Sequence, residues 1–175
     1  MALTTLRAGA FPSGAVLQTV QTVLTSAVDV GSIAQGAESG NVSGLTRTIT
    51  PSSTSNKVLV MVMLNVSQST VNQNCIATLY RDDSKVSTSV GDSAGSRKQT
   101  TAGGQSTKDA GRDMNTISIM FLDSPSSTSE LTYSVRLSHN EGAGMNLYVN
   151  RTKDDNDANY ANRSASLIIL QEIKG

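Results

Sequence analysis

The sequence predicts an all-β fold, an antiparallel β-sandwich of the jelly-roll type. The composition favours strands, because serine (25) and threonine (19) are abundant beside valine and isoleucine. Apolar residues alternate with polar ones in short runs, and no segment combines a 3.6-residue period with helix caps. The runs recur roughly every 10–15 residues between loops rich in Ser, Gly and Asn, which is typical of sandwiches and jelly rolls.

The first third of the chain contains three expected strands. Val16–Leu24 follows a glycine and is the first of them, and the short run Ala27–Val30 comes next. In Leu45–Thr50, apolar or long side chains alternate with threonines. Pro51 ends this run, because proline has no backbone N–H for a sheet hydrogen bond. The polar segment Ser52–Asn56 then predicts a turn.

Lys57–Val66 is the strongest expected strand because both of its faces are apolar. One face carries Val58, Val60, Val62 and Leu64, and the other carries Leu59, Met61 and Met63. A strand of an antiparallel sandwich usually has one solvent-exposed, polar face. Because both faces of this strand are apolar, we expect it to be central and covered on both sides. Either a second subunit or another part of the same chain could provide the second cover.

The rest of the chain continues the pattern of short strands. In order, the expected strands are Cys75–Arg81, Val86–Val90, Ile117–Leu122, Leu131–Leu137, Leu147–Val149 and Leu167–Ile173. The glycine-rich segment Gly91–Asp113 predicts a long functional loop, and Arg151–Asn162 a second polar loop. Residues 1–13 show no pattern and are interpreted as an N-terminal arm, whereas 14–175 form a single domain.

Charge and composition exclude several classes of protein. Lys+Arg and Asp+Glu balance at 14 each, so the basic footprint of a nucleic-acid-binding protein is missing. A single cysteine excludes an intramolecular disulfide framework and a thiolate zinc site. The longest apolar run, Val58–Leu64, is too short to span a membrane. The start of the chain shows no signal peptide, so we expect synthesis in a cytoplasm.

Two residues could in principle support nucleophilic chemistry. His139 is the only histidine and follows an expected strand, so it is interpreted as a surface or loop residue; no Gly-x-Ser-x-Gly motif accompanies it. Cys75 begins an expected strand beside Ile76, and is interpreted as a small buried hydrophobe. Neither pattern predicts a catalytic site.

A loop cation site remains an alternative for the acidic segment near the C-terminus. Asp155, Asp157 and Asn159 follow the spacing at the start of an EF-hand loop. The sixth position is Tyr160 in place of glycine and the twelfth is Ser166 in place of glutamate, so the motif fails where it is most specific. We therefore favour a solvated acidic turn and assign no metal ligand.

Catalysis by paired carboxylates is disfavoured. The glutamates are scattered, at Glu38, Glu130, Glu141 and Glu172, and only 3% of the residues are aromatic, which leaves little to stack on sugar rings. The same shortage disfavours a soluble carbohydrate-binding module, which needs a row of exposed aromatic side chains. The sequence therefore predicts a protein that is not an enzyme and that has no cofactor-binding residues.

Several turn-and-strand stretches carry a resemblance to a known family. The stretches are Gly14–Gln21, Ile49–Val60, Phe121–Pro125, Tyr148–Thr152 and Ser164–Ile173. They resemble small β-rich virion surface proteins of tailed bacteriophages, a group frequent in marine and cyanobacterial phages. The resemblance covers roughly residues 14–173 and includes no catalytic motif. Members are tail-fibre, virion structural or capsid-surface proteins.

The resemblance implies a structural protein on the virion. It implies either a trimeric knob or fibre head for attachment, or a decoration (cement) protein that stabilises the capsid. Only about 13 residues precede it, with no fibre shaft, which favours a short surface protein. Expected partners are other copies of the chain in a homotrimer, other virion proteins and a host surface glycan.

The residues predicted for these roles fall into two groups. Val16–Leu24 and the apolar strands are expected to meet other subunits. The candidates for subunit packing are Val58, Val60, Val62, Leu64, Leu167 and Ile169. The long loop is expected to face outward with four basic residues, Arg97, Lys98, Lys108 and Arg112.

Overall fold

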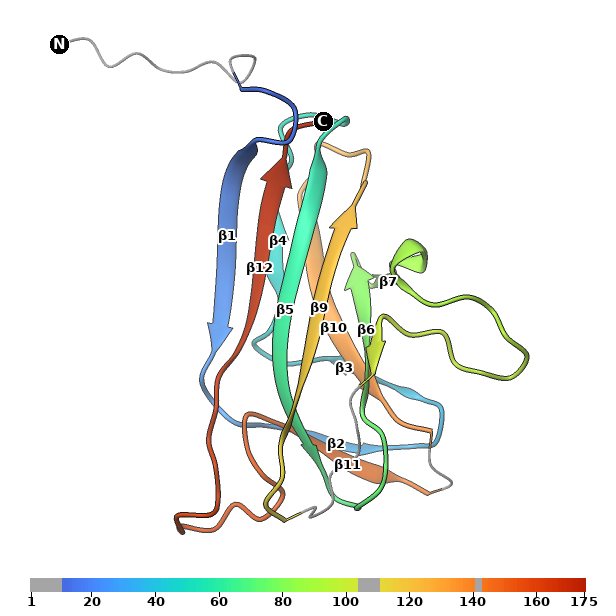
Figure 1. Cartoon of the computed structure of the whole chain (residues 1–175), viewed down its shortest axis with the longest axis vertical. Coiled ribbons are helices and arrows are strands. Elements are labelled where there is room, and N and C mark those ends of the chain that lie inside the picture. The colour runs from blue at the N-terminus through green and yellow to red at the C-terminus, as the bar shows by residue number, and fades with distance from the viewer. Residues whose placement is uncertain (1–10, 104–110, 141–142) are drawn as a thin grey trace, which may run out of the picture.

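Two antiparallel β-sheets face each other in the computed structural model, which describes residues 11–103, 111–140 and 143–175 (Figure 1). The first sheet contains β1 (Val16–Leu24), β2 (Val28–Ile33), β5 (Lys57–Gln68), β9 (Asn115–Asp123), β11 (Met145–Val149) and β12 (Ser166–Ile173). The second contains β3 (Glu38–Asn41), β4 (Arg47–Ile49), β6 (Ile76–Arg81), β7 (Ser84–Lys85), β8 (Ala102–Gly103) and β10 (Leu131–Ser138).

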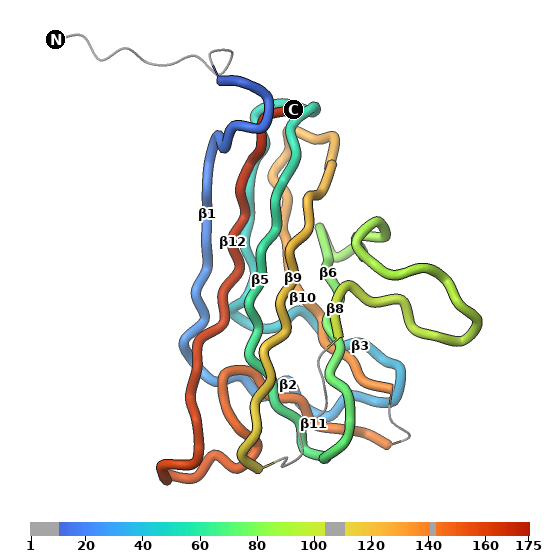
Figure 2. The backbone as a smooth tube through the Cα atoms, in the orientation of Figure 1, coloured from blue at the N-terminus to red at the C-terminus, as the bar shows by residue number. Residues whose placement is uncertain are grey.

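The central strand of the first sheet is β5. It pairs with β9 along one edge from Val58 to Val66. Along its other edge it pairs first with β12, between Lys57 and Met63, and then with β11, between Val66 and Gln68. The long strands therefore run in the order β1-β12-β5-β9, and β11 and β2 extend the sheet at one end (Figure 2).

The topology is that of a jelly roll. When the short strands β2, β3, β7, β8 and β11 are set aside, the chain alternates between the sheets from β1 through β4, β5, β6, β9 and β10 to β12, and the first strand pairs with the last. In the second sheet, β3 and β4 share one side of β10, and β7 and β8 share one side of β6. Each sheet thus has four strand positions, as two Greek keys require. The predicted fold class is confirmed, while the trimer stays a prediction.

The core lies between the two sheets. It contains four of the residues predicted for subunit packing, so that part of the prediction is corrected. Val58, Val60, Val62 and Leu64 are at most 3% exposed and contact the second sheet's inner residues. They are therefore covered by the chain itself and are not available to a second subunit. Sequence alternation showed that β5 has two apolar faces, but it could not show which face the second sheet covers.

Three short strands and one turn differ from the sequence prediction. The expected strand Val86–Val90 is instead a single 3₁₀ turn at Ser87–Ser89. Strands β3 and β7 were not predicted, because the sequences ESGN and SK carry no apolar alternation. Both strands lie at the sheet edge and depend on pairing with β10 and β6. The predicted long loop also contains the two-residue strand β8.

His139 is not the surface histidine that its sequence position predicted. Its side chain is fully buried, and its Nε2 lies 2.6 Å from the carbonyl oxygen of Ile33 at the end of β2. The residue therefore joins the end of β10 to the first sheet. Among the described residues, no helix is long and apolar enough to cross a membrane.

Candidate functional site

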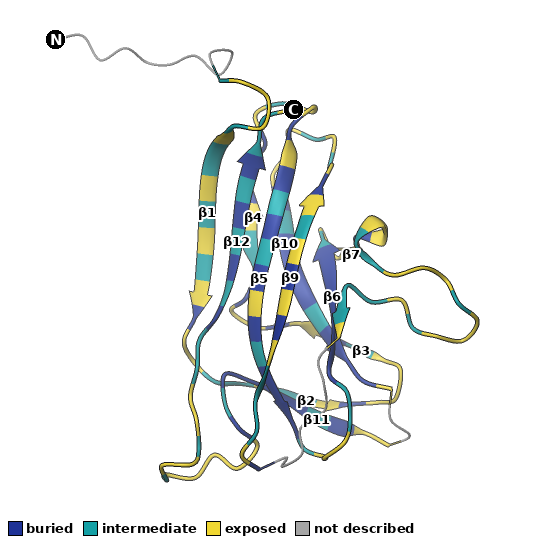
Figure 3. Cartoon of the chain, viewed as in Figure 1, coloured by how far each residue is buried: buried dark blue, intermediate teal, exposed yellow. Residues whose placement is uncertain are grey.

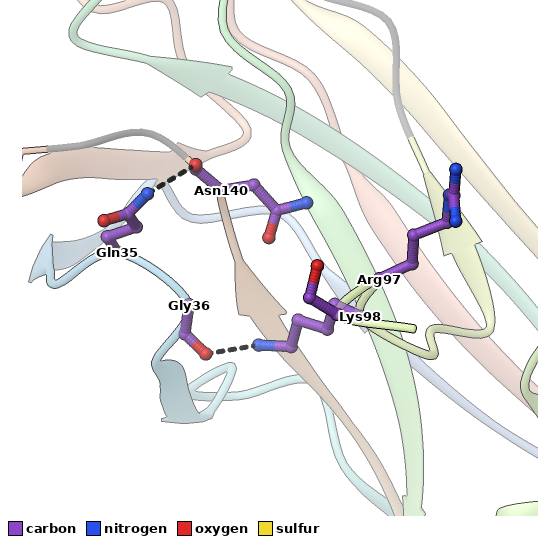
Figure 4. A pocket seen from close by; sticks show the side chains of 6 residues that line it. Gln35, Gly36, Arg97, Lys98 and Asn140 are labelled. Carbon is purple, nitrogen blue, oxygen red and sulfur yellow. Dashed lines mark hydrogen bonds between the residues drawn. The ribbon is translucent and has the colours of Figure 1, made fainter. Parts of the chain in front are cut away.

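A pocket of about 550 Å³ lies where three loops meet at the edge of the second sheet (Figure 4). The turn between β2 and β3, the loop that precedes β8, and the segment after β10 each contribute to it. Its lining residues are Gln35, Gly36, Ser96, Arg97, Lys98 and Asn140. The lining combines neutral amides and a hydroxyl with two basic side chains, and it contains neither a carboxylate nor an aromatic ring.

Hydrogen bonds between the three loops hold the pocket open in one shape. Gln35 Nε2 donates to the carbonyl of Asn140 at 3.1 Å. The backbone N–H of Gly36 donates to the carbonyl of His139 at 3.0 Å. Lys98 Nζ donates to the carbonyl of Gly36 at 2.9 Å (Figure 4). Gly36 has a φ of +69°, which glycine adopts without strain. The pocket is therefore formed before any ligand arrives.

A small ionic cluster supports the wall of the pocket. Glu38 lies 3.4 Å from Lys85 and 3.6 Å from Lys98, and it accepts a hydrogen bond from the hydroxyl of Tyr80. Burial alone would raise the pKa of Glu38, but these partners outweigh burial and hold it below the ordinary value. Burial and the bond to Glu38 raise the pKa of Tyr80 to about 12. Glu38 stays ionised and Tyr80 neutral near pH 7, so neither is poised for proton transfer.

The four basic residues predicted for the long loop do not form one group. Arg97 is exposed at the pocket, whereas Lys98 is half-buried and held by Gly36 and Glu38. The guanidinium of Arg112 lies 4.5 Å from the ring centre of Tyr160, in the other polar loop. Lys108 falls outside the described residues. Arg97 and Arg112 are exposed and Lys98 is only partly exposed, and the outward-facing role of these residues stays a prediction.

The remaining pocket residues were missed by the sequence analysis. Gln35, Ser96 and Asn140 come from three segments that are far apart in the chain, and no local motif marks any of them. The one sequence signal near these residues is Gly36, because glycine is common in turns. The pocket arises from the topology, which brings the ends of β2 and β10 together.

One carboxylate of the acidic segment near the C-terminus, that of Asp155, is paired with arginines of the chain. Arg163 donates to Asp155, with both carboxylate oxygens 2.6 Å from Nη2, and Arg151 lies 3.8 Å from the same carboxylate. The described residues contain no group of three His, Cys, Asp or Glu side chains that could hold a metal ion. This geometry favours the solvated acidic turn over the loop cation site.

The buried carboxylates serve structural hydrogen bonds. Asp123 accepts from Tyr133 at 2.7 Å and from Arg81, which ties the end of β9 to β10 and β6. Glu172 accepts bonds from residues of β1 and of the turn before β5. Glu38 and Glu172 belong to different sheets and Glu130 is exposed, so these glutamates do not pair; Glu141 lies outside the described residues.

Cys75 is a buried residue of the core, as its sequence context predicted. Its side chain is 1% exposed, and burial raises the pKa of the thiol to about 12. A thiol is nucleophilic only as the thiolate, so this side chain is inert near pH 7 in the folded protein.

We expect a thiol reagent to modify Cys75 only when the protein opens. At pH 7 the rate should be at least a hundredfold below that of Ser93→Cys in a Cys75→Ala background, because residue 93 is exposed. Denaturant should raise the rate for Cys75 in parallel with unfolding followed by circular dichroism. Native-state modification at the rate of the exposed control would contradict this burial.

The outer face of the first sheet is apolar. Cross-strand register places Ile169, Met61 and Met120 in one row, and Leu59 beside Leu122 in the next. We define the apolar face as Val16, Val23, Leu59, Met61, Met63, Met120, Leu122, Leu167, Ile169 and Ile173. Leu167 and Ile169, two of the predicted subunit-packing residues, are partly exposed there. Their role in subunit packing stays a prediction.

Comparisons with known proteins identify no family. No protein-family model matches the chain, and no curated protein matches it. Among solved structures, it is similar to a chain in the structure of infectious bursal disease virus, Gt strain, at 12% sequence identity and a TM-score of 0.45. The match covers 99% of this chain and 42% of that chain. The resemblance to phage virion proteins therefore depends on the sequence stretches quoted above.

Proposed function

We propose that this protein is a non-enzymatic structural protein on the surface of a tailed-phage virion. In this role it acts as a knob or fibre head that attaches to a host surface glycan through the loop pocket. The observation that carries the proposal is the preformed polar pocket on a jelly roll whose buried carboxylates are engaged in structural bonds. The jelly roll is a scaffold of viral capsid and lectin domains, and the resemblance to phage surface proteins agrees with it.

The chemistry of the pocket suits a polyhydroxylated ligand. The side chains of Ser96 and Asn140 form no hydrogen bond with other described residues, so their hydroxyl and amide are available to sugar hydroxyl groups. Arg97 adds an exposed cation at the rim, which would favour a sugar that carries a carboxylate. The volume lies within the range of small-molecule sites.

A homotrimer would compensate for a weak single site. Without an aromatic ring for stacking, one pocket is expected to bind a sugar weakly, whereas linked copies gain avidity. We therefore expect the attachment module to be trimeric and to sit on the virion together with capsid, tail or fibre proteins. Three of the four tyrosines, Tyr80, Tyr133 and Tyr148, are at most 6% exposed, which disfavours the carbohydrate-binding module with a row of exposed aromatics.

Binding to host cells tests the proposed attachment. Ser96→Ala with Asn140→Ala should weaken binding of the labelled protein to host cells at least fivefold. Asn156→Ala changes an exposed asparagine in a different loop and is the matched control. Glycosidase treatment of the cells should abolish the difference between the variants. Equal binding of both variants would refute attachment through the pocket.

A capsid decoration protein is the second candidate, and the apolar face favours it. Ten apolar residues on one outer sheet face could hold the protein to the shell. Labelling of intact particles with an antibody separates the two: label on the tail supports the fibre head, and label over the head supports decoration. Loss of the protein should lower the melting temperature of the head only in the second case.

A further inference from the structure

The outer faces of the two sheets differ in chemistry. On the second sheet, Ser134 donates to Asn41 at 3.0 Å, Arg136 donates to Asp83 at 2.7 Å, and the Arg136 guanidinium stacks 4.0 Å from the Tyr80 ring centre. That face is polar and several of its groups bond within the chain, although the buried hydroxyls of Thr78 and Ser138 on it have no hydrogen-bond partner among the described residues. Among the residues that the structure describes, none gives the apolar face of the first sheet a comparable polar cover.

The exposed apolar residues gather on the apolar face. Seven large hydrophobic side chains among the described residues are exposed, and five of them lie here. These five are Val16, Val23, Met63, Met120 and Leu122, with Met120 77% exposed. Figure 3 shows exposed segments along β1 and β9. Scattered single residues of this kind are ordinary, whereas a contiguous group on neighbouring strands indicates an interaction surface.

The size of the face approaches that of one side of a standard protein interface. Four strands at about 4.8 Å spacing and about eight residues of length give a flat footprint of about 500 Å². The accessible area of pleated side chains exceeds this footprint and so approaches the roughly 800 Å² per partner of a standard interface. A short peptide would cover only part of it.

The chemistry of the face indicates which partner covers it. Between its apolar residues the outer positions are Thr19, Gln21, Ser118 and Gln171, and the one charge in register with them, Lys57, lies at the end of the rows. An acidic or basic partner would find no complementary charge. A surface of the same uncharged kind fits, and flexible methionines allow two such surfaces to interdigitate.

We propose that the apolar face is covered by other copies of this chain, and that Met61, Met120, Leu122 and Ile169 form the centre of the contact. The proposal deepens the proposed function, because it locates the subunit contact of the multi-copy module. In a threefold assembly the three apolar faces turn toward the axis. The loop pocket is built on the second sheet's edge and stays open to a ligand.

Light scattering over a concentration series tests the contact. The wild-type protein should have a mass of several times the 18.3 kDa of one chain. Leu122→Lys and Met120→Lys should raise the dissociation constant at least a hundredfold and give the single-chain mass. Val71→Lys places the same charge on an apolar side chain that is 39% exposed in the turn after β5, and it should leave the mass unchanged.

The outcomes separate this inference from the proposed function. A mass of three chains that Leu122→Lys abolishes supports both the contact and the trimer. A mass of two chains abolished in the same way supports the contact and overturns the trimer. A wild-type monomer, or an oligomer that Leu122→Lys leaves intact, overturns the contact. An unchanged far-ultraviolet circular dichroism spectrum and an unreactive Cys75 show that each variant is folded.

Discussion

Replacing Glu172 by glutamine is expected to lower the free energy of unfolding by about 3 kcal/mol near pH 7. Glu172 is 1% exposed on the inner face of β12, near the end of the sandwich where β1 begins. Its carboxylate accepts four hydrogen bonds from Gln18, Ser52 and Asn56, at 2.5 to 2.7 Å. A glutamine amide would direct a donor N–H group toward these donors, so at least one bond becomes a repulsive contact.

The same carboxylate should make stability depend on pH in the acid range. Burial alone would raise the pKa of Glu172, but the bonds from Asn56, Ser52 and Gln18 outweigh it and hold the folded pKa below the ordinary value of 4.5. A group with a depressed folded pKa binds its proton more readily in the unfolded chain. Its stabilising contribution is therefore present above pH 4.5 and is lost as the pH falls through the folded pKa.

Urea denaturation between pH 7 and pH 2.5 checks both parts of this prediction. The wild-type protein should lose stability below pH 4.5, and Glu172→Gln should flatten part of that slope. Glu130→Gln changes an exposed glutamate and should alter the free energy of unfolding by less than about 0.5 kcal/mol. If Glu172→Gln were as stable as wild type at pH 7, the carboxylate would not hold this end of the sandwich.

The strands could be predicted from the sequence wherever burial dictates an apolar alternation. The boundaries of β1 are those expected, and β10 matches the alternating run Leu131–Leu137 within one residue. Strand β3 could not be predicted, because its residues are polar and its stability comes from pairing with β10. A pattern of single residues carries no information about such pairing across almost a hundred positions of the chain.

Buried polar residues were the hardest to anticipate. His139 was expected at the surface because histidine beside Asn and Glu usually marks a turn, yet it is fully buried against Ile33. The cost of burying its ring is offset by the hydrogen bond that the ring donates to a carbonyl at the end of a distant strand, which sequence spacing does not reveal. The loop pocket is hidden for the same reason, since Gln35 and Asn140 meet only after β2 and β10 have folded.

Asn150→Ala is expected to be the most destabilising single change that the polar core offers, at about 4 kcal/mol. Asn150 follows β11, is fully buried and has a φ of +62°. Its Nδ2 donates to the carbonyls of Leu24 at 2.7 Å and Ser26 at 3.1 Å, and its Oδ1 accepts from Ser166 at 2.6 Å. The side chain thus joins the end of β1 to the start of β12, which are the first and last strands of the jelly roll.

Three further variants divide this effect into its causes. Asn150→Gly loses the same hydrogen bonds but adopts a positive φ freely, so it should be about 1 kcal/mol more stable than the alanine variant. Asn150→Asp keeps the acceptor for Ser166 but turns a carboxylate oxygen toward the carbonyls of Leu24 and Ser26. This variant should therefore be less stable than Asn150→Gly. Asn72→Ala removes an exposed asparagine with a φ of +58° and should show the backbone effect alone.

Urea denaturation of the four variants at pH 7 measures these differences. A loss for Asn150→Ala no larger than that for Asn72→Ala would mean that the three hydrogen bonds of the Asn150 side chain contribute nothing. The expected ranking is wild type, Asn72→Ala, Asn150→Gly and then Asn150→Ala. The reason is that the buried carbonyl of Leu24 and the hydroxyl of the buried Ser166 lose a partner that water cannot replace, whereas the exposed backbone at Asn72 stays solvated. The closure of the jelly roll between β1 and β12 therefore depends on one amide as well as on apolar burial.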